Sequence, residues 1–191
     1  MIYIVNTGNF LSAHTSKLGY TLAFGSSEMK IPSFGQWLRL STPYSDKVLL
    51  DKIKNWPHLH KAAAFDDWVA NSDRHFENIL FAGEDNFYLI DHGHCFTGPG
   101  WSKKKLDPDV NVSNKLLDTV KKIGRDESNK MLSEIGFVNE WGSVDIQDLG
   151  LKTNAKEYEA QSLIKDVVAF IQTRFSGLET RLRRELGGLP L

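Results

Sequence analysis

The chain has 191 residues, of which 41% are hydrophobic and 25% charged, as is typical of a folded globular domain rather than a disordered segment. Its 23 basic and 24 acidic side chains give a formal net charge of -1, so no global field favours nucleic acid or an anionic membrane. The single cysteine, Cys95, excludes an internal disulfide and a cysteine-rich metal site. With no 18-residue apolar window and no secretion signal, we expect a soluble, cytoplasmic protein without a membrane span.

The predicted strands lie at the N-terminus and in the middle of the chain. The β-branched and aromatic runs at 1–7 and 18–24 predict two strands joined by a polar turn. Two further apolar runs, 79–81 and 87–90, flank the turn-forming residues 82–86 and predict a β-hairpin.

Most of the remaining chain has the apolar spacing of helices. Helices are predicted over 34–40 with Ser33 as its cap, 46–56, 58–70, 113–123, 126–135 and 155–186, and a loop over 93–109. An apolar stripe on the last helix is interpreted as core. Few strands and many helices indicate a mainly helical α+β domain.

The residues that carry chemistry lie between Asp73 and Asp91. Asn78 follows Asp73 by five positions, and Asp91 follows Asn78 by thirteen, at the end of an apolar run. In phosphoryl transfer one carboxylate orients the acceptor hydroxyl, while an Asn and a second carboxylate hold the magnesium ions on the phosphates. Because Asn78 begins the first hairpin strand and Asp91 ends the second, we expect both at one edge of the hairpin.

The same segment resembles the catalytic segments of known kinases. DRHFENIL at 73–80 and IDHGH at 90–94 are similar to the DRHxxNI and IDFGH motifs of phosphoinositide lipid kinases. NSDRHFEN at 71–78 resembles the catalytic loop of HipA-like bacterial kinases. The resemblance implies a kinase-like C-terminal lobe that binds ATP and Mg²⁺ and transfers a phosphoryl group.

Residue by residue, the resemblance implies four roles. Asp73 would be the catalytic carboxylate, and Asn78 and Asp91 would bind the metal and the nucleotide phosphates. His75 would be a structural or phosphate-side residue of the catalytic loop. The phosphate acceptor, whether protein, lipid or small molecule, is not identified by these motifs.

The resemblance also implies a division of the chain into two parts. In the HipA-like family an apolar-Phe-Gly-Ser tract links the two lobes, and Phe24, Gly25 and Ser26 match this tract. The resemblance implies that the backbone near Phe24 would face the adenine of the nucleotide. Residues 1–27 would then be remnant strands of an N-terminal lobe and the hinge. Residues 28–191 would be the helical catalytic lobe.

The sequence also departs from the kinase pattern. No glycine-rich loop precedes residue 60, no Val-Ala-x-Lys strand occurs, and His92 replaces the Phe of Asp-Phe-Gly. We therefore expect a lobe that needs a missing N-terminal portion to complete the ATP site, either from the same gene or from a partner, which would be a separate N-lobe or a regulatory protein chain. One alternative is a catalytically degenerate kinase fold used for binding or regulation. Another is a metal-dependent phosphohydrolase in which His75, His92 and His94 join the two aspartates as ligands.

Overall fold

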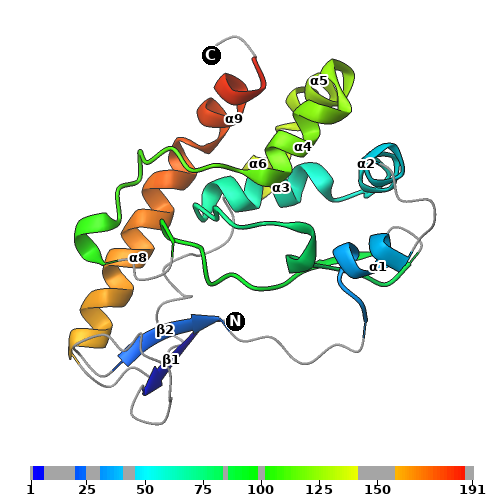
Figure 1. The fold of residues 1–191 in the computed structure, drawn as a ribbon. Helices are drawn as coiled ribbons and strands as arrows, with labels where there is room; N and C mark the ends of the chain where they lie inside the picture. The colour runs from blue at the N-terminus through cyan, green and yellow to red at the C-terminus, as the bar shows by residue number, and fades with distance from the viewer. Residues whose placement is uncertain are drawn as a thin grey trace.

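The structure is a computed structural model that describes residues 2–6, 20–24, 31–40, 46–83, 86–98, 102–141 and 158–187. In these ranges the chain is mainly helical and carries two small antiparallel sheets (Figure 1). The predicted mainly helical α+β class is confirmed at this level. None of the described helices is long and apolar enough to cross a membrane.

Each sheet has two strands. β1 (Ile2–Asn6) pairs with β2 (Tyr20–Phe24), and β3 (Ile79–Phe81) pairs with β4 (Phe87–Leu89), so all four predicted strands are confirmed. β3 lies beside α1, and the main chain of Ser33 forms an isolated bridge with β3 (Figure 1). The β3–β4 hairpin is therefore attached to the helical part at its outer edge.

The other described elements are helices, which are joined by loops. They are α1 (Phe34–Leu40), α2 (Asp46–Lys54), α3 (Leu59–Trp68), the 3-10 turns η2 (Phe76–Asn78) and η3 (Lys103–Lys105), α4 (Lys115–Ile123), α5 (Arg125–Glu134), α6 (Phe137–Trp141), α8 (Tyr158–Ser176) and α9 (Leu178–Leu186). The helix starts follow local chemistry. The Ser33 hydroxyl accepts from Gln36 N–H at 3.0 Å, as predicted, and Asn114 Oδ1 accepts from Leu117 N–H at 3.0 Å.

The main hydrophobic core contains residues of helices α1, α2, α3, α4 and α5, of the β3–β4 hairpin and of α9. Phe34, at the start of α1, is fully buried and meets the rings of Phe76, Phe81 and Phe87 edge-on, with centroids 5.1–5.6 Å apart. Because Phe76 belongs to η2, this aromatic cluster fixes the motif segment against α1 and the hairpin.

A second core lies where the motif segment begins and ends. It consists of Val69, Ala70, Cys95, Phe96, Val167 and Phe170. Trp68 at the end of α3 donates from Nε1 to the carbonyl of Ile171 in α8 at 2.9 Å. The second core thus anchors both ends of the segment that carries the kinase-like motifs, and the main core anchors its middle.

The single long helix predicted over 155–186 is wrong in one respect, because it is broken at Gly177 into α8 and α9. Glycine is the weakest helix former after proline. Arg181 Nη2 donates to the carbonyl of Arg174 at 2.7 Å and so satisfies the end of α8 from the next helix. The predicted loop at 93–109 contains η3, and α6 was not predicted.

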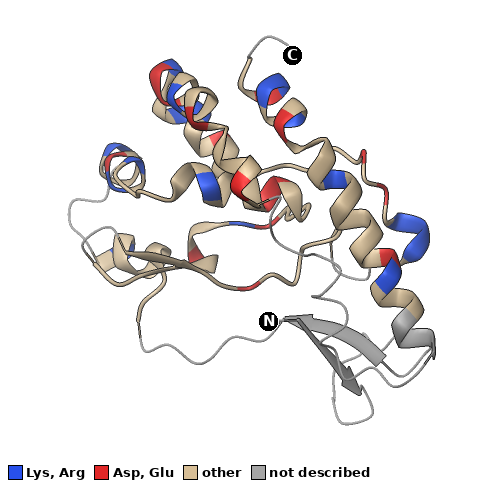
Figure 2. Ribbon diagram, turned by 180° about the vertical axis from the view of Figure 1, so that it is seen from behind, with Lys and Arg blue, Asp and Glu red and all other residues tan. Residues whose placement is uncertain are grey.

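Acidic and basic residues are interspersed along the described helices (Figure 2). Lys103, in the lysine run 103–105, pairs with Asp166 of α8 at 2.9 Å, with the lysine side chain 73% exposed. This exposure agrees with a solvated interpretation of the run.

Candidate functional site

The loop after α3 begins the site. Asn71 accepts from the main-chain N–H of Asp73 through Oδ1 at 3.1 Å and donates from Nδ2 to Asp66 Oδ1 at 2.9 Å. Asn71 and Asp66 are fully buried, whereas Asp73 is partly exposed. The Asp73 main chain is therefore held by a buried network while its carboxylate faces outward.

Asn78 joins the two ends of the motif segment. Its Nδ2 donates to the main-chain carbonyl of Asp73 at 2.9 Å. Its own main-chain carbonyl accepts from Ile90 N–H at 3.1 Å, directly before Asp91. Because Nδ2 is used by Asp73, Oδ1 is the side-chain atom of Asn78 that could coordinate a cation.

Arg74 is the buried centre of the segment. Its guanidinium donates to the Asp66 carboxylate from Nε and Nη2 and to the carbonyls of Asn78 and Ile90 from Nη1. Burial raises the pKa of Asp66, and the charge and hydrogen bonds of Arg74 oppose that effect. Both side chains are fully buried, so their hydrogen bonds set the distance between the loop and the end of β4.

Asp91 has an unusual backbone conformation. Its φ of 50° lies in the left-handed region, which Asp tolerates better than most residues. Its Oδ1 accepts from the main-chain N–H of Gly93 at 3.1 Å, and a Cβ placed on Gly93 would lie only 3.2 Å from that oxygen. Asp91 is exposed, so the tight turn presents its carboxylate to solvent.

His92 has a structural partner. Arg74 Nη2 donates to its Nδ1 at 3.0 Å, and Phe65 of α3 packs edge-on to its ring at 5.8 Å. Burial, together with the charge of Arg74, lowers the pKa of His92 to about 4. His92 is therefore a neutral, hydrogen-bonded residue at neutral pH, and Phe65 packs against its ring.

Three basic side chains surround the carboxylate of Asp73. Lys115 Nζ lies 2.6 Å from Oδ1, while Nε2 of His75 and of His94 lie 3.6 Å and 3.9 Å from Oδ2. The hydrogen bond from Lys115 is the main reason that the pKa of Asp73 is lowered, despite opposing desolvation. Asp73 is therefore an anion at neutral pH, with its two oxygens in different surroundings.

The structure places the predicted site residues as follows. Asp73, His75 and Asn78 share one loop, and Asn78 links that loop to the residue before Asp91. Phe24 ends β2, and its neighbours Gly25 and Ser26 lie outside the described residues.

His75 also contributes to the shape of the loop. Its Nδ1 accepts from the main-chain N–H of Glu77 at 3.2 Å, so the ring caps η2. Glu77 in turn accepts from Ser33 and from Arg39. These contacts tie the loop over residues 71–78 to α1, and they are consistent with a structural role for His75.

The metal-centre alternative has little geometric basis in this region. Among the described residues, no group of three or more His, Cys, Asp or Glu side chains is arranged to hold a metal ion. His92 in addition accepts from Arg74 through Nδ1. Cys95 is buried, and burial raises the pKa of its thiol to about 12, so it remains protonated.

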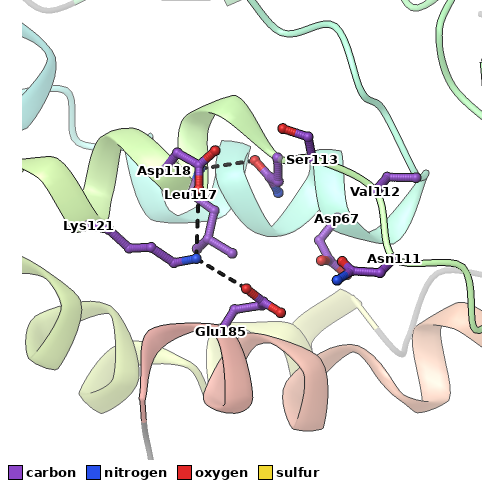
Figure 3. Close-up of a pocket in the computed structure, with 9 residues that line it drawn as sticks. Asp67, Asn111, Val112, Ser113, Leu117, Asp118, Lys121 and Glu185 are labelled. Atoms are coloured by element: carbon purple, nitrogen blue, oxygen red, sulfur yellow. Dashed lines mark hydrogen bonds and ion pairs between the residues drawn. The ribbon is translucent and has the colours of Figure 1, made fainter.

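A cavity of about 340 Å³ is lined by residues 111–114 and by side chains of α3, α4 and α9 (Figure 3). Its charged groups neutralise one another, because Lys121 contacts Glu185 at 3.1 Å and Asp118 at 3.7 Å, and Asp67 contacts Arg181 at 2.9 Å. The cavity shares no lining residue with the 71–96 segment. We therefore place the candidate site at Asp73 rather than in this cavity.

Two residues of the site were missed by sequence reasoning. Lys115 lies 42 positions after Asp73, beyond any local motif. Arg74 stands within the DRH motif, but nothing in a single sequence shows that its guanidinium is buried. An arginine inside a motif and a lysine at a helix start are the signals that could have suggested them.

Comparisons of the chain with protein-family models, with curated proteins and with solved structures found no match.

Proposed function

We propose that the chain is the catalytic lobe of an ATP- and Mg²⁺-dependent phosphotransferase of the HipA-like kind. The proposal is carried by the position of Asn78, which bonds to Asp73 through its side chain and to the residue before Asp91 through its carbonyl. The bond from Ile90 continues the β3–β4 pairing by one residue pair, so the hairpin holds Asn78 beside the residue that precedes Asp91. A phosphoryl-transfer site needs such an arrangement, because a carboxylate, an amide oxygen and a second carboxylate must meet at one phosphate.

Each residue has a role in this proposal. Asp73 accepts the proton of the acceptor hydroxyl while that oxygen bonds to the γ-phosphorus and the bond from phosphorus to the departing nucleoside diphosphate breaks. Asn78 Oδ1 and the Asp91 carboxylate hold the cation, because hard oxygen donors are the ligands that Mg²⁺ prefers. Mg²⁺ bound with ATP neutralises charge on the phosphates.

The lowered pKa of Asp73 keeps its carboxylate ionised at neutral pH, the state in which it can accept a hydrogen bond from the acceptor hydroxyl and orient it. The φ of 50° at Asp91 also supports the proposal, because strained residues cluster at functional sites. The sequence lacks a glycine-rich loop, so we propose that a separate N-lobe or regulatory chain supplies the residues that contact the nucleotide phosphates from the other side.

The test is calorimetry of nucleotide binding with and without Mg²⁺, on wild type, Asp91→Asn and Asp73→Asn. Asp91→Asn should weaken Mg²⁺-dependent ATP binding, because a carboxylate ligand is replaced by a neutral amide. Asp73→Asn should leave ATP affinity nearly unchanged and abolish transfer once a partner completes the site. An ATP affinity that changes neither with Mg²⁺ nor with Asp91→Asn would contradict the proposal.

A second candidate is a kinase-fold module that binds nucleotide without transferring phosphate. It is favoured by the lack of a glycine-rich loop and a Val-Ala-x-Lys strand in the sequence. The same titrations separate the two candidates, because a binding module would hold Mg²⁺ and ATP but show no transfer with any added partner.

A further inference from the structure

Lys115 reaches the site from outside the kinase-like motifs. Its Nζ lies 2.6 Å from Asp73 Oδ1, although 42 positions separate the two residues in the chain. We infer that Lys115 is the cation of this site that contacts the phosphoryl group to be transferred. This inference rests on the proposed function and names a further catalytic residue for it.

The position of Lys115 in its helix is unfavourable for stability. Lys115 is the first residue of α4, directly after the capping residue Asn114. The N-terminus of a helix carries partial positive charge, so a carboxylate is the stabilising side chain there and a lysine is not. Lys115 does not stabilise the start of α4. The contact of Lys115 with Asp73 therefore explains a lysine at this position better than helix stability does.

The backbone that carries Lys115 is firmly held. Asn114 donates from Nδ2 to the carbonyl of Ala63 in α3 at 2.8 Å and accepts from Leu117 N–H. The side chain of Lys115 remains 42% exposed. The fold therefore fixes the backbone from which the Lys115 side chain extends, while the flexible stem lets the ammonium group adjust to a ligand.

The two oxygens of Asp73 are differently occupied. Oδ1 receives Lys115 at 2.6 Å, whereas Oδ2 has only the longer approaches of His75 at 3.6 Å and His94 at 3.9 Å. We therefore place the acceptor hydroxyl at Oδ2. Such a hydroxyl lies about 2.7 Å from Oδ2, and the phosphorus that it attacks lies about 3–3.5 Å beyond it.

A phosphate at that distance lies within reach of the Lys115 stem. An ammonium group bound to a carboxylate at one edge has donors left for a phosphate oxygen, because lysine carries three N–H groups. His75 and His94 add further polar N–H or N atoms around the same carboxylate. The ligand class that fits this set is a polyphosphate, either the triphosphate of ATP or a free polyphosphate.

The first test measures acylation of lysines by the N-hydroxysuccinimide ester of acetic acid, followed by mass spectrometry. Lys115 should be acylated several-fold more slowly when Mg²⁺ with ATP, or Mg²⁺ with inorganic tripolyphosphate, is present. AMP should protect it less. Lys104, an exposed lysine of η3, is the internal control and should react at the same rate throughout.

The second test compares Lys115→Met, Lys115→Arg and the control Lys104→Met. Lys115→Met should bind ATP about tenfold more weakly relative to AMP, as expected for the loss of one charge-assisted hydrogen bond. Lys115→Arg should retain most of the preference for ATP, and Lys104→Met all of it. A purely structural ion pair would alter thermal stability and leave the ratio of ATP to AMP affinity unchanged.

The outcomes separate this inference from the proposed function. Normal Mg²⁺-dependent ATP binding with an unprotected Lys115 overturns the inference and leaves the proposed function standing. Protection by tripolyphosphate without ATP binding supports a polyphosphate contact at Lys115, but it contradicts the proposed function and overturns the transfer role of Lys115. If neither ligand protects Lys115, the inference is overturned.

Discussion

The side-chain amide of Asn78 donates to the main-chain carbonyl of Asp73 across 2.9 Å, and this bond closes the loop over residues 73–78. Asn78 is 7% exposed, so the bond is shielded from water. The spacing of five residues in the motif therefore has a direct structural meaning. It is the separation at which the second side chain folds back onto the first residue of the loop.

Replacing Asn78 should separate its two roles. In Asn78→Ala both the donor to Asp73 and the oxygen for a cation are lost, whereas Asn78→Asp loses the donor but keeps oxygen ligands. We expect Asn78→Ala to cost about 1–3 kcal/mol of unfolding free energy, because the Asp73 carbonyl loses its partner, and Asn78→Asp to cost more, because it also places a buried carboxylate beside that carbonyl. Mg²⁺-dependent ATP binding, measured by calorimetry, should be lost in Asn78→Ala and retained in Asn78→Asp. Equal loss in both variants would speak against a cation at Oδ1.

Arg74 offers a test of how the segment is held together. In Arg74→Met the buried Asp66 carboxylate loses its partner, which we expect to cost about 3–5 kcal/mol in urea unfolding. The matched control is Arg183→Met on α9, where the pair with Glu179 is one helical turn apart and partly exposed. That change should cost less than about 1 kcal/mol. Similar costs for the two variants would show that Arg74 is not the centre of the network.

Much of the fold was predictable because its signals are local. Ser33 caps the helix that follows it, and the hairpin strands are short apolar runs around turn residues. The break at Gly177 was missed because the apolar stripe continues across it, and the contact that ends α8 comes from Arg181. The apolar pattern predicts the helical stretch, but it does not show that Gly177 divides this stretch into two helices.

The candidate site was predictable only in part, for the same reason. Asp73 and Asn78 belong to one short motif, and Asp91 follows at the end of a recognisable strand. Lys115 contacts Asp73 through packing of α4 against α3, which no spacing in the sequence encodes. The partners of a motif can be found from sequence when they are neighbours along the chain, and otherwise require the fold.

His92 should make the protein less stable in mild acid. Its pKa is lowered to about 4 in the folded protein, by burial and by Arg74, against an opposing effect of Asp91. The unfolded chain takes up the proton near pH 6.5, so the free energy of unfolding should fall between about pH 6.5 and about pH 4. His92→Gln can keep an acceptor for Arg74 but does not titrate. Urea unfolding at several pH values should therefore show a shallower acid slope in this variant, and equal slopes would contradict the burial of a neutral His92.

The turn at Asp91 gives the last prediction. A Cβ added at Gly93 would lie 3.2 Å from Asp91 Oδ1, closer than most such contacts, so Gly93→Ala should push the carboxylate aside by a few tenths of an ångström. A metal ligand tolerates little displacement, because Mg²⁺ requires near-ideal geometry. We expect Mg²⁺-dependent ATP affinity, measured by calorimetry, to fall several-fold with only a small change in thermal stability.

The matched control is Gly136→Ala in the turn between α5 and α6, where an added Cβ meets nothing within 4 Å. This variant carries the same chemical change and should leave ATP affinity as in wild type. Because Gly93 is exposed, its substitution leaves the two cores unaltered, and a loss of binding can be attributed to Asp91 rather than to unfolding. Unchanged affinity in Gly93→Ala would mean that the Asp91 carboxylate does not hold the cation, and the proposed role of Asp91 would then be wrong.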